Sequence, residues 1–209
     1  MKILAITDLH AEEQALEFLE KLVLKHSPDA VFCCGDMSDF HAEHFARDVK
    51  EKCDSLKVRL IAVLGNADER TDEKLLGDSS IEKKRIEFEG FNVVGFGGAS
   101  NAVGPNSFDD SELYNRIGKF VDGNTVLLVH APPAGRTVAM TKTGKDIGTK
   151  SLVRLIDEKQ PLAVICGHAH EREGIEKMGA TKIIKVSPLM YGKAAIVELP
   201  QAKTEFVST

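Results

Sequence analysis

The chain has 209 residues, of which 43% are hydrophobic and 28% charged, and its formal net charge at pH 7 is −5. This length and composition predict one soluble globular domain that spans residues 1–209 and has a substantial core of its own. The acidic balance argues against a protein that binds duplex nucleic acid or a membrane surface, because such proteins usually present a basic face.

No signal peptide or membrane span is predicted. The first apolar run, residues 3–6, ends at Asp8 and is too short for the apolar region of a signal peptide. Without secretory features, the four cysteines are expected to be reduced thiols in a cytoplasmic protein. Cys33, Cys34 and Cys166 lie in apolar, strand-like runs, where cysteine acts as a small hydrophobic residue.

Eight short apolar runs, rich in Val and Ile and bounded by Gly, Pro or Asp, predict β-strands. They cover residues 2–7, 30–34, 60–64, 92–96, 126–129, 162–166, 182–186 and 194–199. Amphipathic stretches between them predict helices over residues 12–25, 41–52, 111–121 and 151–158. Because several strands are apolar throughout, we expect an α/β fold whose sheets are covered on both faces. The irregular segment 132–150 is expected to border a functional site.

Side chains that could bind metal ions follow five of the predicted strands. They are Asp8, His10, Asp36, Asn66, His130, His168 and His170. The carboxyl edge of the strands is where α/β folds place ligand sites. Oxygen and imidazole donors without thiolate suit Mn²⁺, Fe or Zn²⁺ in a site that is not purely structural. Seven donors are too many for one tetrahedral ion, but they suffice for two ions that share a carboxylate and are completed by water.

None of these motifs is specific by itself. Asp-x-His at residues 8–10 is common by chance, Gly35-Asp36 is usually a turn, and His130 could be a hydrogen-bonded core residue. Gly-His-x-His at residues 167–170, directly after a buried strand, is a stronger metal signal. All five motifs in order, each closing an apolar run, make coincidence a poor explanation.

This ordered set resembles the calcineurin-like metallophosphoesterase superfamily. The short chain and the stretch 130–133, His-Ala-Pro-Pro, are similar to small prokaryotic, especially archaeal-type, phosphodiesterases of that superfamily. The resemblance implies an αββα sandwich of two mixed β-sheets. It also implies that Asp8, His10 and His170 bind one metal ion, that Asn66, His130 and His168 bind a second, and that Asp36 bridges them. Asp36, Asn66 and His130 would then be catalytic.

One position departs from the superfamily pattern. Many members read Gly-Asn-His-Asp or Gly-Asn-His-Glu, where the histidine helps to protonate the leaving group, whereas this chain reads Gly65-Asn66-Ala67-Asp68. Ala67 cannot donate a proton. Asp68 is interpreted either as a partner of a ligand histidine or as a helix N-cap, and Asp68 and His41 are the candidates for a substitute acid.

The function implied by the resemblance is that of a dinuclear metal-dependent hydrolase of small phosphate esters, and a phosphodiesterase in particular. Two divalent ions are expected, with Mn²⁺ first and Fe, Zn, Ni or Co as alternatives. A phosphomonoesterase, a nuclease and a catalytically silent metal-binding scaffold are the alternative functions, and the chain could form a homodimer. His41 and His44 could share a metal or lie on an exposed face. Arg70, Lys142 and Lys145 could attract phosphate or be ordinary surface charges.

Overall fold

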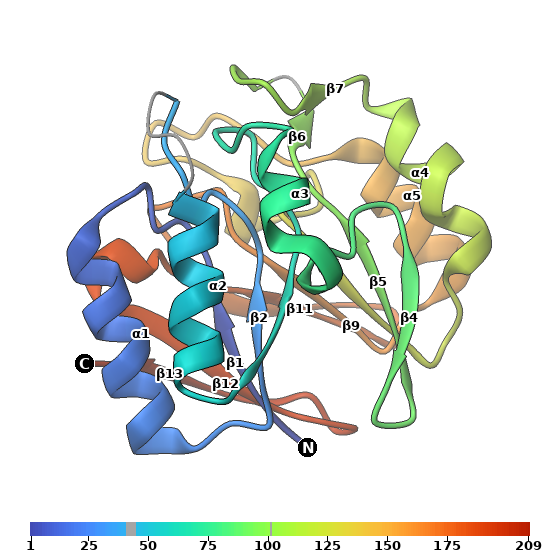
Figure 1. Cartoon of the computed structure of the whole chain (residues 1–209). Coiled ribbons are helices and arrows are strands. Elements are labelled where there is room, and N and C mark those ends of the chain that lie inside the picture. The colour runs from blue at the N-terminus through green and yellow to red at the C-terminus, as the bar shows by residue number, and fades with distance from the viewer. Residues whose placement is uncertain (41–44, 101) are drawn as a thin grey trace.

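The computed structural model describes residues 1–40, 45–100 and 102–209. It shows two mixed β-sheets packed face to face, with helices over the outer face of each sheet (Figure 1). The predicted αββα sandwich is therefore confirmed.

The first sheet has five strands: three parallel strands form one side of it, and two strands that pair antiparallel form the other. In spatial order they are β13 (Lys203–Ser208), β12 (Lys193–Glu198), β1 (Lys2–Ile6), β2 (Ala30–Cys33) and β3 (Arg59–Ala62). Helices α1 (Glu13–His26) and α2 (Phe45–Ser55) cover its outer face (Figure 1).

The second sheet has six strands, and its four parallel central strands are flanked by one antiparallel strand at each edge. In spatial order they are β10 (Gly174–Met178), β11 (Thr181–Lys185), β9 (Ala163–Cys166), β8 (Thr125–Val129), β5 (Phe91–Phe96) and β4 (Arg85–Phe88). Helices α4 (Ser111–Ile117) and α5 (Lys150–Lys159) cover its outer face. The short helix α3 (Asp72–Leu76) follows β3, and the short strands β6 (Ala99–Ser100) and β7 (Ser107–Phe108) pair with each other.

The strands are apolar throughout because both of their faces are buried. In β1, Ile3 points into the core between the sheets, while Leu4 packs with α1 and α2 on the other side. In β8, Leu128 faces the core between the sheets and Leu127 packs under α4 and α5. Since successive strand side chains point to opposite faces, each central strand needs an uninterrupted apolar run.

All eight predicted strands are present, with bounds that differ by at most two residues from the predicted ones. The predicted helices 12–25, 111–121 and 151–158 correspond to α1, to α4 with a following 3₁₀ turn, and to α5. The predicted helix 41–52 corresponds to α2, and its first four residues, 41–44, lie outside the described residues. The prediction that residues 1–209 form one domain stays a prediction.

The prediction missed the edge strands β4, β10 and β13. In β13, residues Lys203–Ser208, every side chain is exposed or half-buried, and lysine and glutamate interrupt the apolar residues. Charged side chains are common on edge strands because they discourage pairing with another chain. The same charges weaken the pattern by which a strand is recognised from sequence.

The cysteines have the surroundings predicted for small hydrophobic residues. All four are buried and none forms a disulfide with another described cysteine. Burial raises the pKa of the Cys166 thiol to about 12, so this thiol is protonated at neutral pH. As for membrane association, no helix among the described residues has both the length and the apolar character needed to cross a bilayer.

Phe32 tests the packing between the sheets. Its ring is completely buried in the core between them. We expect Phe32→Ala to lower the free energy of unfolding by about 3–5 kcal/mol, because it removes apolar contacts and leaves a cavity. Leu24→Ala on α1, where the side chain is 66% exposed, should change it by less than about 0.5 kcal/mol. Urea unfolding followed by circular dichroism measures both, and equal midpoints would contradict this view of the core.

Candidate metal centre

All seven residues predicted as metal ligands lie together where parallel strands of the two sheets end. Asp8 and His10 follow β1, Asp36 follows β2, and Asn66 follows β3. From the second sheet, His130 follows β8, and His168 and His170 follow β9. Parallel strands place their carboxyl ends at one edge of a sheet, so the stacked sheets bring five loops together there.

Asp8, His10 and His170 form the first group of donor atoms. The Nε2 atom of His170 lies 3.2 Å from the Oδ1 atom of Asp8 and 3.2 Å from Nε2 of His10. Nε2 of His10 lies 3.9 Å from the same Asp8 oxygen. Atoms bound about 2.1 Å from one ion lie roughly 3–4 Å from one another, so this group has the spacing of a metal site.

Asp36, His130 and His168 form the second group. The Nε2 atom of His130 lies 3.3 Å from Oδ2 of Asp36 and 3.2 Å from Nδ1 of His168. Asn66 belongs here too, because its Oδ1 atom lies 3.1 Å from Nε2 of His130. The amide of Asn66 donates to the carbonyl oxygen of Val103 (3.1 Å), which turns Oδ1 towards the histidine.

Asp36 lies between the two groups. Its Oδ2 atom is 3.3 Å from Nε2 of His130 in the second group and 3.9 Å from Nε2 of His10 in the first. Its other oxygen, Oδ1, accepts a hydrogen bond from the backbone N–H of Ala67 (2.8 Å). Asp36 thus has one oxygen held by the protein and one directed at histidines of both groups.

A backbone contact orients the buried ring of His130. Its Nδ1 atom donates to the carbonyl oxygen of Cys34 at 2.8 Å, which leaves Nε2 to face Asp36 and Asn66. A histidine whose second ring nitrogen is held in this way presents a fixed lone pair to a metal. This contact could not be predicted from the sequence, because the partner is a main-chain oxygen, which every residue has.

The protonation of the site is governed by burial and by the carboxylates. Burial alone would lower the pKa of His130, but the charge of Asp36, the hydrogen bond to it and the charge of Asp8 together outweigh burial and raise this pKa to about 9. Burial opposes ionisation of Asp8, yet its hydrogen bond with His170 and the charge of His130 hold its pKa well below the usual range. Burial and the neighbouring His130 lower the pKa of His168 to about 4. His168 therefore offers a neutral imidazole at neutral pH.

The backbone around these residues is strained. Asp8, His10, Asp36 and His168 all have positive φ, between 50° and 70°. Residues other than glycine adopt this conformation at a cost, and such strain is concentrated at functional sites. Close approach adds to it, because a Cβ atom on Gly65 would lie 1.9 Å from Oδ1 of Asp36. The glycine before Asn66 is therefore required by the position of the Asp36 carboxylate.

Neither interpretation of Asp68 was right. Its buried carboxylate accepts hydrogen bonds from the backbone N–H groups of Ser38 (2.6 Å) and Gly65 (2.7 Å). It therefore ties the loop after β2 to the loop after β3, whereas α3 begins at Asp72 after Thr71. Burial and the nearby Asp36 raise the pKa of Asp68 to about 8. Both oxygens of Asp68 are thus engaged by backbone N–H groups, and among the described residues no metal-ligand histidine is hydrogen-bonded to its side chain. His41 and His44 lie outside the described residues.

The donor set fits divalent ions. Two buried carboxylates, one amide oxygen and four imidazoles converge without thiolate, which suits Mn²⁺, Fe²⁺ or Zn²⁺. Beside His170 lies a cavity of about 750 Å³, bordered by Thr137, Val138 and Tyr191. The predicted loop 132–150 thus does border the site.

Comparison with known proteins agrees with this geometry. The sequence model of the calcineurin-like phosphoesterases matches residues 1–172. An uncharacterized protein of Methanocaldococcus jannaschii is 32% identical over 207 residues, which cover 91% of this chain and 90% of that protein. The chain therefore belongs to the calcineurin-like phosphoesterase family, whose members are hydrolases that use divalent metals.

Two solved structures share the fold. A protein of Thermus thermophilus superposes with a TM-score of 0.81 at 18% identity, over 99% of this chain and 98% of its own. A structure described as that of a novel archaeal phosphodiesterase superposes with a TM-score of 0.62 at 13% identity, over 100% of both chains. At these identities the likeness shows the fold alone.

Asp36→Ala tests whether one carboxylate serves both donor groups. If it does, the variant should retain fewer than the two ions per chain expected of the reconstituted protein, because both groups lose a donor. Metal analysis after gel filtration measures the ratio, and Asp78→Ala at an exposed carboxylate is the control. An unchanged ratio in a folded Asp36→Ala protein would rule out the shared role.

The pKa values predict how pH affects the metal-free protein. His130 has a pKa of about 9 when folded and 6.5 when unfolded, so its stabilising contribution is complete below pH 6.5 and is lost as pH rises through 9. The raised pKa of Asp68, about 8, acts in the same direction, because the folded protein loses stability as pH rises from 3.8 towards 8. The melting temperature should thus fall between pH 6.5 and 9 after chelation and change less with Mn²⁺ bound. A flat or rising profile for the metal-free protein would contradict this assignment.

Proposed function

We propose that this protein is a dinuclear metal-dependent phosphodiesterase, and the position of Asp36 carries the proposal. Its Oδ2 atom lies within 4 Å of a histidine from each donor group. In this proposal one ion is held by Asp8, His10 and His170 and the other by Asn66, His130 and His168, with Asp36 shared.

Two bound divalent ions would neutralise charge on a phosphoryl group and lower the pKa of a water so that it can attack phosphorus. The protein's own part is to hold the donors before the ions arrive. The Cys34 carbonyl fixes the ring of His130, the Val103 carbonyl fixes the amide of Asn66, and the Ala67 N–H fixes Asp36. Preorganised groups stabilise developing charge at little cost, because they need not reorganise during the reaction.

The leaving group receives no help from residue 67. Ala67 is completely buried, its side chain has no polar atom, and its backbone N–H holds Asp36. Both oxygens of Asp68 accept backbone N–H groups. In this proposal the departing oxygen is therefore stabilised by the centre itself or protonated by solvent, and His41, which lies outside the described residues, stays the candidate for a substitute acid. Esters with acidic alcohols should be hydrolysed fastest.

Several finer features belong to the same proposal. The proposal of diesters over monoesters rests on the resemblance of the short chain and of residues 130–133 to small prokaryotic phosphodiesterases. The cavity beside His170 has room for a small organic substituent of the ester. The mixed oxygen and imidazole donors suit Mn²⁺, Fe²⁺ or Zn²⁺, and Mn²⁺ is the ion proposed first. Four buried, reduced cysteines support a cytoplasmic location. A homodimer is also proposed, and light scattering tests it.

Turnover of matched esters tests the function. The Mn²⁺-reconstituted protein should hydrolyse bis(4-nitrophenyl) phosphate faster than 4-nitrophenyl phosphate, and His168→Ala should lower kcat/KM at least about 10²-fold because one ion loses a ligand. Leu24→Ala on the distant end of α1 should leave the rate unchanged. Faster turnover of the monoester would overturn the diester preference. No turnover of either ester by a protein that holds two ions would favour a silent scaffold.

A series of aryl and alkyl diesters tests the missing acid. Rates should fall steeply as the pKa of the leaving alcohol rises, because protonation by a positioned acid, typically worth about 10²–10⁴-fold, is missing. Ala67→His should flatten this dependence where the variant keeps its melting temperature and metal content, and Ala67→Leu is the control for bulk. A shallow dependence in the unaltered protein would show that another group donates the proton.

A further inference from the structure

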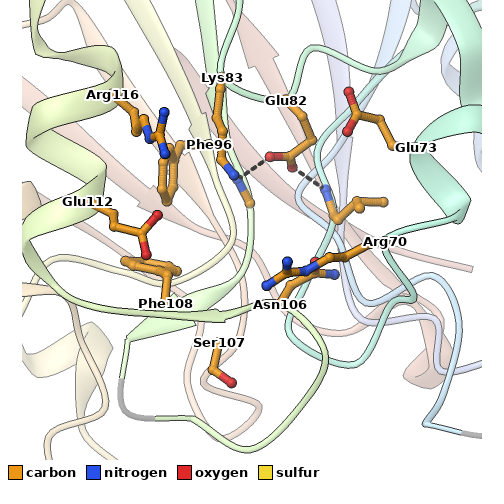
Figure 2. Close-up of a pocket in the computed structure, with 12 residues that line it drawn as sticks. Arg70, Glu73, Glu82, Lys83, Phe96, Asn106, Ser107, Phe108, Glu112 and Arg116 are labelled. Atoms are coloured by element: carbon orange, nitrogen blue, oxygen red, sulfur yellow. Dashed lines mark hydrogen bonds between the residues drawn. The ribbon is translucent and has the colours of Figure 1, made fainter.

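A second cavity, of about 300 Å³, lies at the carboxyl end of β5 beside α3 and α4 (Figure 2). Its walls include Arg70, Lys83, Arg116, Phe108 and Asn106. Among the described residues that line it, none is a predicted metal ligand. The volume is at the lower end of the range for small-molecule sites, so any ligand must be small.

Two of the acidic side chains at this cavity already have partners. Glu82 is buried at its base, where one oxygen accepts the backbone N–H of Leu64 (2.7 Å) and the other that of Gly97 (3.3 Å), as Figure 2 shows. Burial raises the pKa of Glu82, so its negative charge is disfavoured. Glu73 lies 3.5 Å from the ammonium group of Lys84. Glu112 is the remaining carboxylate of the lining.

The cationic side chains of the cavity, in contrast, lack carboxylate partners among the described residues. Within residues 1–40, 45–100 and 102–209, no ion pair is formed by Arg70, Lys83 or Arg116. The Nε atom of Arg70 donates to the carbonyl oxygen of Pro105 (3.1 Å), which holds its guanidinium at the rim. Figure 2 shows these three cations among the side chains that line the cavity. Counting Glu112 against them leaves an excess of positive charge, which favours an anion.

The cavity also has an apolar side. The rings of Phe96 and Phe108 pack edge to face with centroids 4.9 Å apart, and the ammonium of Lys83 lies 5.6 Å from the centroid of Phe96. Phe96 is buried, whereas Phe108 is half-buried and lines the cavity. A ligand bound by the cations could therefore place a flat apolar group against Phe108.

We propose that this cavity is a second binding site, separate from the metal centre, for a small organic phosphate monoester. Arg70 and Arg116 would bind the phosphoryl oxygens, and the organic group would lie against Phe108. The Nδ2 atom of Asn106 donates to the carbonyl oxygens of Gly65 (3.1 Å) and Asp68 (2.5 Å). The ligand would thus adjoin the side chain that holds the loop carrying Asn66.

Calorimetric titration of the Mn²⁺-loaded protein with phenylphosphonate tests the proposal, because the P–C bond of this probe resists hydrolysis. We expect two classes of binding site, one of them at the metal centre. Arg116→Gln and Arg70→Gln should each weaken the other class about tenfold, since each removes a charge-assisted hydrogen bond. Arg47→Gln, which removes an exposed guanidinium on α2, should not. Methylphosphonate should bind this class more weakly because it has no ring.

Binding to the Asp36→Ala variant separates a failure of this proposal from a failure of the proposed function. In Asp36→Ala the class that depends on Arg116 should persist, whether or not the protein proves to be a phosphodiesterase. Melting temperatures establish that each variant is folded. The proposal is overturned if phenylphosphonate binds only in one class that Asp36→Ala removes, if Arg116→Gln and Arg70→Gln bind it as the unaltered protein does, or if no binding is detected at millimolar probe.

Discussion

The close approach of buried charges at the strand edge is the constraint on which the rest of this structure depends. Asp8 and Asp36 are both almost completely buried, and the charge of Asp8 disfavours ionisation of Asp36. Two carboxylates removed from water in this way require positive charge beside them. In the metal-free chain the proton on His130 supplies part of it. Divalent ions would supply more, which gives a physical reason for metal binding at this point.

Two features of the fold allow the buried carboxylates to come close together. The backbone at the donors is strained, and glycines stand where a side chain would collide with a neighbour. Each donor sits at the end of a strand whose position is fixed by packing on both faces, so the strained backbone at Asp8 and Asp36 cannot relax without moving a sheet. Residue 167 also has no room for a side chain, because a Cβ atom on Gly167 would lie 1.9 Å from Oγ1 of Thr7. Stability of the sandwich is therefore what holds the donors in place.

The strands place the donors and local contacts orient them, and this difference explains what could be predicted from the sequence. The central strands are continuous apolar runs, and the donors directly follow them, so both the fold and the gathering of the seven side chains were predictable. The contacts that orient the donors were not, because they use main-chain atoms such as the carbonyls of Cys34 and Val103. Asp68 was misinterpreted for the same reason, since its partners are backbone N–H groups far apart in sequence. The order of side chains in the sequence does not indicate which main-chain groups will be close to them in the fold.

The loop after β3 connects the two sites discussed above. On one side its Asn66 faces His130, and on the other Leu64 gives its N–H to Glu82 at the base of the second cavity. Asn106 then holds the loop between them through the carbonyls of Gly65 and Asp68. A segment fixed from both sides has little freedom to move independently, so a displacement of this loop at one cavity would change the same hydrogen bonds that position Asn66. Coupling between the sites, where it exists, would act equally in both directions, because linkage is reciprocal.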